Sequence, residues 1–167
     1  MTNKDFFTAQ WKSEVKGTVD VLKAMPADKM DYRPHPKNRS AAELMSHMTT
    51  HVDDLIEMAD KGTIGHNAHA KFSTPSEAAA HFEKKSSELL TKINSMDEKT
   101  WHEKLVPFMV NGNKAFEAPA MNMAWTILMD VIHHRGQMTT YLRPMGGRIP
   151  AVYGPTADTM EEQVQHA

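Results

Sequence analysis

The sequence predicts an all-α fold, a four-helix bundle with one long crossover connection between its third and fourth helices. Four long segments repeat apolar residues at three- and four-residue steps, which place side chains on one face of a helix. Capping motifs and prolines mark where these segments begin and end. A chain of 167 residues fits a single domain spanning residues 1–167. Its tail after about residue 150 is rich in turn residues and is expected to be partly irregular.

The first helix is predicted over residues 3–25, because the proline at position 26 disfavours a helical conformation of the residue before it. Its apolar stripe comprises Phe7, Trp11, Val15, Val19 and Leu22. The segment 26–39 contains three prolines and is expected to form a loop.

The second and third helices each begin at a capping-box pattern. Ser40 and Glu43 predict the start of the second helix, and Gly62 predicts its end. Thr74 and Glu77, with a proline at the first helical position, predict the start of the third helix. The apolar stripe of the third helix continues to about residue 96.

The helical pattern weakens over residues 97–118. The dipeptide Asn111-Gly112 is favoured in hairpin turns, so a short pair of strands is one interpretation and an irregular crossover is the other. The fourth helix is predicted from about residue 119 to residue 143, where Pro144 and the glycines that follow end it.

The composition excludes several classes of function. The chain has no cysteine, so it can form neither a disulfide nor a Cys-ligated metal site and has no thiol nucleophile of its own. Its 19 basic and 21 acidic residues lack the basic excess of nucleic-acid binders. The most apolar stretch, residues 123–129, is too short to span a bilayer, and the first residues do not resemble a signal peptide. These features predict a cytoplasmic protein that binds neither nucleic acid nor membrane.

Two predicted helices carry polar residues within their apolar stripes. His47 and His51 interrupt the second helix, and Asp130 and His134 interrupt the fourth. A four-residue step stacks two side chains on one helix face, so each pair can offer two ligands to one ion. Helical bundles build metal sites from such inward-facing residues on different helices.

Other interpretations of these residues remain open. Asp130 can be satisfied by an ion pair with Arg135 or Arg143 instead of a metal. We interpret His51 as a boundary residue at the mouth of the site, and His133 as facing a neighbouring helix or solvent. The remaining histidines are expected at the surface, namely His35, His66, His69, His81, His102 and His166.

The fourth-helix motif resembles the signature of a known family. The sequence HRGQ at residues 134–137 is followed by YLR at 141–143, a Gly pair at 146–147 and a proline at 150. This pattern resembles the DinB/YfiT-like family of metalloproteins. The segment SAAELMSH at residues 40–47 is similar to the motif in that family's second helix, which carries its first metal-binding histidine.

The resemblance implies an up-down-down-up four-helix bundle, often a homodimer, with a divalent metal held by three histidines. Carried over to this chain, the ligand positions are His47, Asp130 and His134, and the family usually has histidine where Asp130 stands. Two histidines and one carboxylate suit zinc or nickel, and also iron or manganese. His51 is the candidate to substitute for Asp130.

The resemblance also implies a function, that of the family's thiol S-transferases and its mycothiol-dependent maleylpyruvate isomerase. In such enzymes the metal activates a low-molecular-weight thiol, or water, for attack on an electrophile. Arg135 and Gln137 are candidates to orient ligands or bind a substrate, and Tyr153 is a candidate to cover the pocket mouth. The alternatives are a non-catalytic, stress-related binding or scaffold protein with a structural or vestigial site, or a plain bundle with a hydrogen-bond network.

Overall fold

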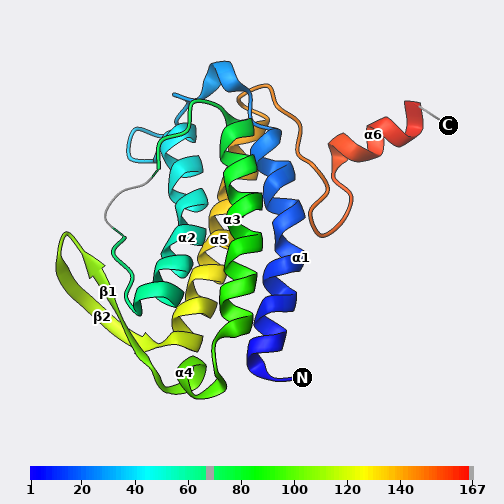
Figure 1. Ribbon diagram of the computed structural model, residues 1–167. Helices are drawn as coiled ribbons and strands as arrows, with labels where there is room; N and C mark the ends of the chain where they lie inside the picture. The colour runs from blue at the N-terminus through cyan, green and yellow to red at the C-terminus, as the bar shows by residue number, and fades with distance from the viewer. Residues whose placement is uncertain (67–69, 166–167) are drawn as a thin grey trace.

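Four long helices lie side by side and make up most of the fold (Figure 1). They are α1 (Asn3–Lys23), α2 (Ala41–Lys61), α3 (Pro75–Ser95) and α5 (Ala120–Leu142). In this computed structural model, which describes residues 1–66 and 70–165, α1 and α2 each pack against both α3 and α5. The mostly helical fold and the four long helices agree with the sequence prediction.

Local capping explains where the helices begin. The Ser40 hydroxyl accepts from the Glu43 amide at 3.1 Å, and the Glu43 carboxylate accepts from the Ser40 amide at 2.9 Å, so the predicted capping box of α2 is present. The pattern at α3 is incomplete, because the Glu77 carboxylate accepts from the amide of Ser73 rather than from that of Thr74. Gly62 ends α2 in the left-handed conformation, with φ of 70°.

The segment between α3 and α5 contains a hairpin, so the predicted all-α class is wrong in this respect. After the short helix α4 (Glu98–Glu103), strands β1 (Leu105–Val110) and β2 (Asn113–Pro119) pair antiparallel. Asn111 and Gly112 both have positive φ, 50° and 78°, as a tight hairpin turn of this kind requires. Of the two interpretations of this segment, the strand pair is therefore confirmed.

Two further short helices depart from the predicted loops. A 3₁₀ helix, η1 (Ala27–Lys29), lies in the proline-containing segment after α1. The tail contains α6 (Ala157–Gln165), which projects away from the long helices (Figure 1). The tail was expected to be partly irregular.

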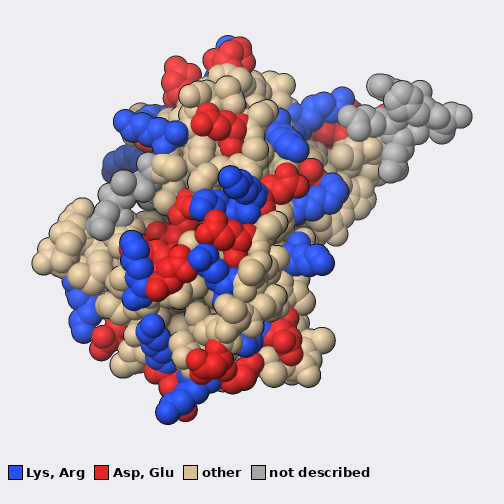
Figure 2. All heavy atoms as spheres, viewed as in Figure 1, with Lys and Arg blue, Asp and Glu red and all other residues tan. Residues whose placement is uncertain are grey.

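Apolar side chains fill the space between the helices. The largest fully buried ones include Phe7, Trp11, Phe82 and Trp101. On the face seen in Figure 2, basic and acidic side chains are interspersed. The ion pair of Lys92 with Asp60 joins α3 to α2. Among the described residues, no helix is both long and apolar enough to cross a membrane.

The capping box gives a first prediction. Ser40→Ala removes the acceptor of the Glu43 amide, and we expect it to lower the free energy of unfolding by about 1 kcal/mol. Chemical denaturation of full-length protein measures this. The matched control is Ser13→Ala, an exposed position inside α1, which should change stability by less than about 0.5 kcal/mol. Equal effects of the two substitutions would contradict the capping role.

Candidate metal centre

A cluster of imidazole and carboxylate groups lies between α2 and α5. His47 and His51 come from α2, and Asp130 and His134 come from α5. The structure brings these four sequence-predicted residues together, because ligand atoms from all four lie within 4.8 Å of one another. The four-residue spacing on each helix and the packing of α2 against α5 produce this convergence.

His51 lies between two carboxylates. Its Nε2 is 2.9 Å from Oδ2 of Asp130, and its Nδ1 is 3.1 Å from Oδ2 of Asp54. The His51 and Asp54 side chains are both buried. The interpretation of His51 as a boundary residue is therefore wrong, since the ring is enclosed at the centre of the cluster.

His134 is held in a similar way from α5. Its Nδ1 lies 2.7 Å from Oε1 of Gln137, one helical turn further on, and its Nε2 lies 3.4 Å from Oδ1 of Asp130. The ring of His47 packs edge-on against those of His51 and His134, at centroid distances of 4.6 and 4.5 Å. The three imidazole rings thus surround one space.

The electrostatics of the cluster favour ionised carboxylates. Hydrogen bonds with His134 and His51 hold the pKa of the Asp130 carboxyl well below its usual range, against the smaller effect of burial. Burial alone would raise the pKa of Asp54, but hydrogen bonds with His51 and His66 lower it overall. Burial also acts to lower the pKa of His51, and its bonds to the two carboxylates raise it above the ordinary value. The cluster therefore presents ionised carboxylates beside imidazoles, a set of groups that could hold a divalent metal ion.

The alternative partners considered for Asp130 are not used. Arg135 is buried and pairs instead with Glu14 at 2.6 Å, and Arg143 pairs with Asp158 at 3.2 Å. The Asp130 side chain is 41% exposed to solvent, so it lies at the edge of the apolar stripe rather than within it. Its described partners are the two histidines.

Of the other predicted site residues, one contacts the cluster and two lie away from it. Gln137 contacts His134 and so can orient it, as one of the sequence interpretations proposed. Arg135 is directed toward α1, where it binds Glu14 and Thr18. Tyr153 is stacked against Arg135 and donates to Glu14, so it does not cover the mouth of the pocket.

Two residues of the site were missed by sequence reasoning. Asp54 lies three residues after His51 on the same face of α2, a spacing that could have identified it. His66, expected at the surface, is partly buried, and its Nδ1 lies 2.8 Å from Oδ2 of Asp54. It lies in the loop after α2 with φ of 35°, and no periodic pattern predicts the position of such a residue.

The remaining histidines lie apart from the cluster or at its edge. His35, His102 and His133 are exposed, and His133 also borders the pocket beside the cluster. His81 is half-buried and pairs with Asp53 at 2.8 Å. His69 and His166 lie outside the described residues.

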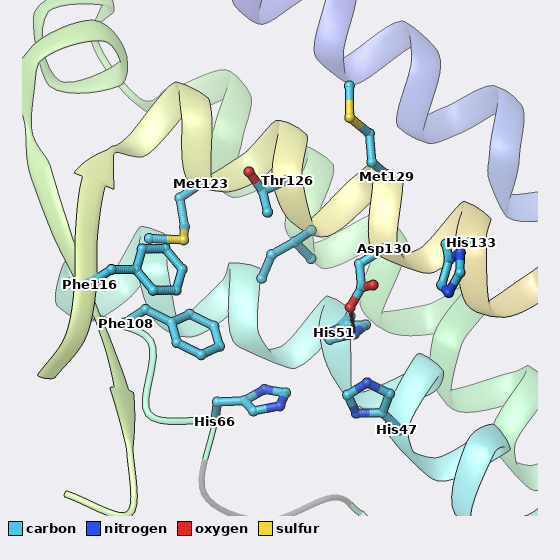
Figure 3. Close-up of a pocket in the computed structure, with 11 residues that line it drawn as sticks. His47, His51, His66, Phe108, Phe116, Met123, Thr126, Met129, Asp130 and His133 are labelled. Carbon is cyan, nitrogen blue, oxygen red and sulfur yellow. Dashed lines mark ion pairs between the residues drawn. The ribbon is translucent and has the colours of Figure 1, made fainter. Parts of the chain in front are cut away.

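A pocket of about 450 Å³ opens beside the cluster (Figure 3). His47, His51, His66 and Asp130 line one end, and apolar side chains of the hairpin and α5 line the other. This volume is in the range of small-molecule sites in proteins. The arrangement places convergent ligand groups at the wall of a cavity that a small molecule can enter.

Comparisons with known proteins agree on family and fold. The model of the DinB family matches residues 1–165. The crystal structure of a DinB-like protein from Bacillus subtilis has a TM-score of 0.67 and 16% identity, covering 89% of this chain and 99% of that one. A DinB-like protein from Bacillus cereus has a TM-score of 0.69 and 17% identity, covering 88% and 95%. At these identities the two structures show a common fold alone, and no curated protein matches the chain.

The contacts of His51 predict a pH response of the metal-free protein. Its pKa is higher in the folded than in the unfolded chain, where it is about 6.5. Protonated His51 therefore stabilises the fold below about pH 6.5, and this stabilisation is lost as the pH rises through the folded-state pKa. Asp130→Asn should lower the pKa of His51, because it removes the negative charge beside Nε2.

Titration of the His51 Cε1 proton by NMR measures this shift. Asp53→Asn is the matched control, because Asp53 is the residue next to Asp54 but binds His81 outside the cluster. The control should leave the pKa of His51 in place. A pKa of His51 that is the same in Asp130→Asn and the unsubstituted chain would contradict the ion pair.

Proposed function

Because the chain belongs to the DinB family, we propose that it holds a divalent transition metal at His47, His51, Asp130 and His134 and uses it to activate a thiol or water. The four side chains supply three imidazoles and one carboxylate. This donor set suits zinc or nickel best, and iron or manganese can also be bound by it. The four long helices would then form the four-helix bundle that carries the site.

The position of His51 between two carboxylates is the observation that carries the proposal. A neutral imidazole has one N–H and one lone pair, so it can donate to only one of the two carboxylates that it faces. The second contact requires an additional proton or a metal cation. With the Nδ1 proton directed at Asp54, the Nε2 lone pair is directed at the space shared with Asp130, where a cation satisfies both groups.

The residues around the ligands prepare the imidazoles for metal binding. Asp54 accepts from Nδ1 of His51 and Gln137 accepts from Nδ1 of His134, so both rings present Nε2 to the centre. Such outer partners orient metal-binding histidines and raise their basicity. The tautomer with its proton on Nδ1 is thus favoured for both His51 and His134.

A bound divalent cation would supply Lewis acidity and lower the pKa of a thiol or water molecule that it binds. The chain itself contributes no thiol, so a low-molecular-weight thiol has to come from a cosubstrate. The pocket beside His47, His51 and Asp130 offers room for that cosubstrate and an electrophile. A metal site that borders an open pocket supports a catalytic role, because structural metal sites are usually closed.

The competing function is a non-catalytic, stress-related binding or scaffold protein that keeps a structural or vestigial metal site. It predicts metal binding without turnover. A screen of low-molecular-weight thiols against electrophiles, with the zinc-loaded and nickel-loaded protein, separates the two functions. The homodimer remains a proposal that follows from the family resemblance, and light scattering tests it. The cytoplasmic location remains a proposal that follows from the composition of the sequence.

Metal content gives the direct test of the centre. Untagged protein should bind one divalent ion per chain, and His47→Gln or His134→Gln should weaken binding by more than about 100-fold, because each removes a ligand. Competition with a chromophoric chelator measures the affinities, and circular dichroism checks the helix content of each variant. His102→Gln, an exposed histidine of α4, is the control. Metal affinity equal in all three variants would overturn the centre.

A second prediction concerns the outer carboxylate. Asp54→Asn should weaken metal affinity by about 10- to 100-fold, because His51 loses the charged acceptor of its Nδ1 proton. The same chelator competition measures the effect. Asp53→Asn changes the overall charge equally at the adjacent position and should leave the affinity within about twofold of the unsubstituted protein. If both substitutions weaken binding alike, Asp54 acts only through overall charge.

A further inference from the structure

We propose that the β1–β2 hairpin forms an aromatic subsite that binds an uncharged, apolar ring of the substrate beside the metal centre. The inference rests on the proposed function, because the ring is assigned to a molecule whose reacting end lies at the metal. It adds the class of substrate and the residues that select it. The argument comes from the pocket wall, the hairpin's attachment and the charges that line the cavity.

The apolar end of the pocket is built by the hairpin and the first half of α5. Figure 3 shows the rings of Phe108 and Phe116 on one side of the pocket, with Asp130, His51 and His47 on the other. Met123 and Ile127 of α5 also line this pocket. A molecule in this cavity therefore contacts the hairpin rings and the metal ligands at its two ends.

The two phenylalanines form a preformed wall. They are opposite each other in the strand register, and their rings are stacked at a centroid distance of 5.0 Å and an interplanar angle of 14°. Phe116 remains 47% exposed despite this contact. Exposed aromatic surface at the mouth of a cavity favours binding of an apolar ligand, because the ligand removes that surface from water.

The wall is fixed relative to the metal ligands. Ile64, fully buried in the loop after α2, donates to the Pro107 carbonyl at 3.0 Å and accepts from the Met109 amide at 2.8 Å. These two bonds attach β1 to the segment that carries His66. The ring of His66 lies 5.1 Å from that of Phe108, so the aromatic wall continues directly to the cluster.

The strand register places the two rings beside each other. The pairing shifts next to them, because Phe108 pairs with Phe116 whereas Met109 pairs with Lys114, so the extra residue, Ala115, belongs to β2. Irregularities of this kind bend the strand that carries the extra residue. Both Phe108 and Phe116 line the pocket.

The described residues at the apolar end of the pocket offer no cationic partner to an anion. Among the lining residues that the structure describes, Asp130 is the only carboxylate, and none is lysine or arginine. Arg135, the sequence candidate for binding a substrate carboxylate, is paired with Glu14 instead. A carboxylate placed against Phe108 and Phe116 would lose its hydration without gaining a cationic partner. The subsite therefore favours a neutral ring.

Two hydroxamates test the subsite with the zinc-loaded full chain. Acetohydroxamate and benzohydroxamate chelate a metal through the same group and differ only in a methyl or phenyl substituent. We expect benzohydroxamate to bind about tenfold more tightly, and Phe116→Ala to reduce this gain by about three- to tenfold without changing acetohydroxamate binding. Isothermal titration calorimetry measures both affinities.

The matched control is Phe6→Ala. Phe6 is 46% exposed, close to the value of Phe116, but its ring packs against Trp125 and does not line the pocket. This variant should keep the full gain from the phenyl group. A benzohydroxamate with a para carboxylate should bind more weakly than benzohydroxamate itself, because the added charge lies against the apolar wall.

The outcomes separate this inference from the proposed function. If acetohydroxamate binds but the phenyl group brings no gain, or Phe116→Ala keeps that gain in full, the subsite is wrong and the metal centre stands. If benzohydroxamate with a para carboxylate binds as tightly as benzohydroxamate itself, the selection for uncharged substrates is wrong. If neither hydroxamate binds the zinc-loaded protein, the bound metal has no position open to a substrate, so the proposed reactive centre is overturned, and the substrate role of the hairpin with it.

Discussion

The ion pairs of Asp130 with two histidines are the interaction on which the candidate site depends. Asp130 extends from α5 toward His51 of α2, and it also contacts His134 one turn away on its own helix. Hydrogen bonds with these histidines hold the pKa of this partly exposed carboxylate below its usual range. The contact with His51 joins the two helices that carry the proposed ligands, and its negative charge makes the cluster receptive to a cation.

A chain of contacts connects this centre to the hairpin. His51 contacts Asp54, Asp54 contacts His66, and the ring of His66 packs beside Phe108. The loop that carries His66 is held by the bond from the Gly65 amide to Glu57 at 2.7 Å. The proposed metal ligands, the outer carboxylate and the pocket wall are therefore parts of one connected structure. The proposed reactive centre and the proposed ring subsite are thus linked by neighbouring residues.

Sequence reasoning succeeded where the determining interactions are local. Glu43 caps α2 from three residues away, and the left-handed turn at Asn111-Gly112 depends on two adjacent residues. Periodicity also placed His47 and His51 on one face of α2, and the same reasoning extended to Asp54 would have found the outer carboxylate. It did not predict that His51 is enclosed, because burial depends on what α5 places opposite it.

By itself, the sequence determined the long helices, most of their boundaries and the pairs of polar residues on α2 and α5, since periodicity and capping act over a few residues. The tertiary structure alone decided that Arg135 binds Glu14 rather than Asp130, and that His66 enters the site from a loop. It also decided that the hairpin walls the pocket, through its bonds to Ile64. These contacts join residues far apart in the chain, and such partners are chosen by the packing of whole elements and not by the spacing within any one of them.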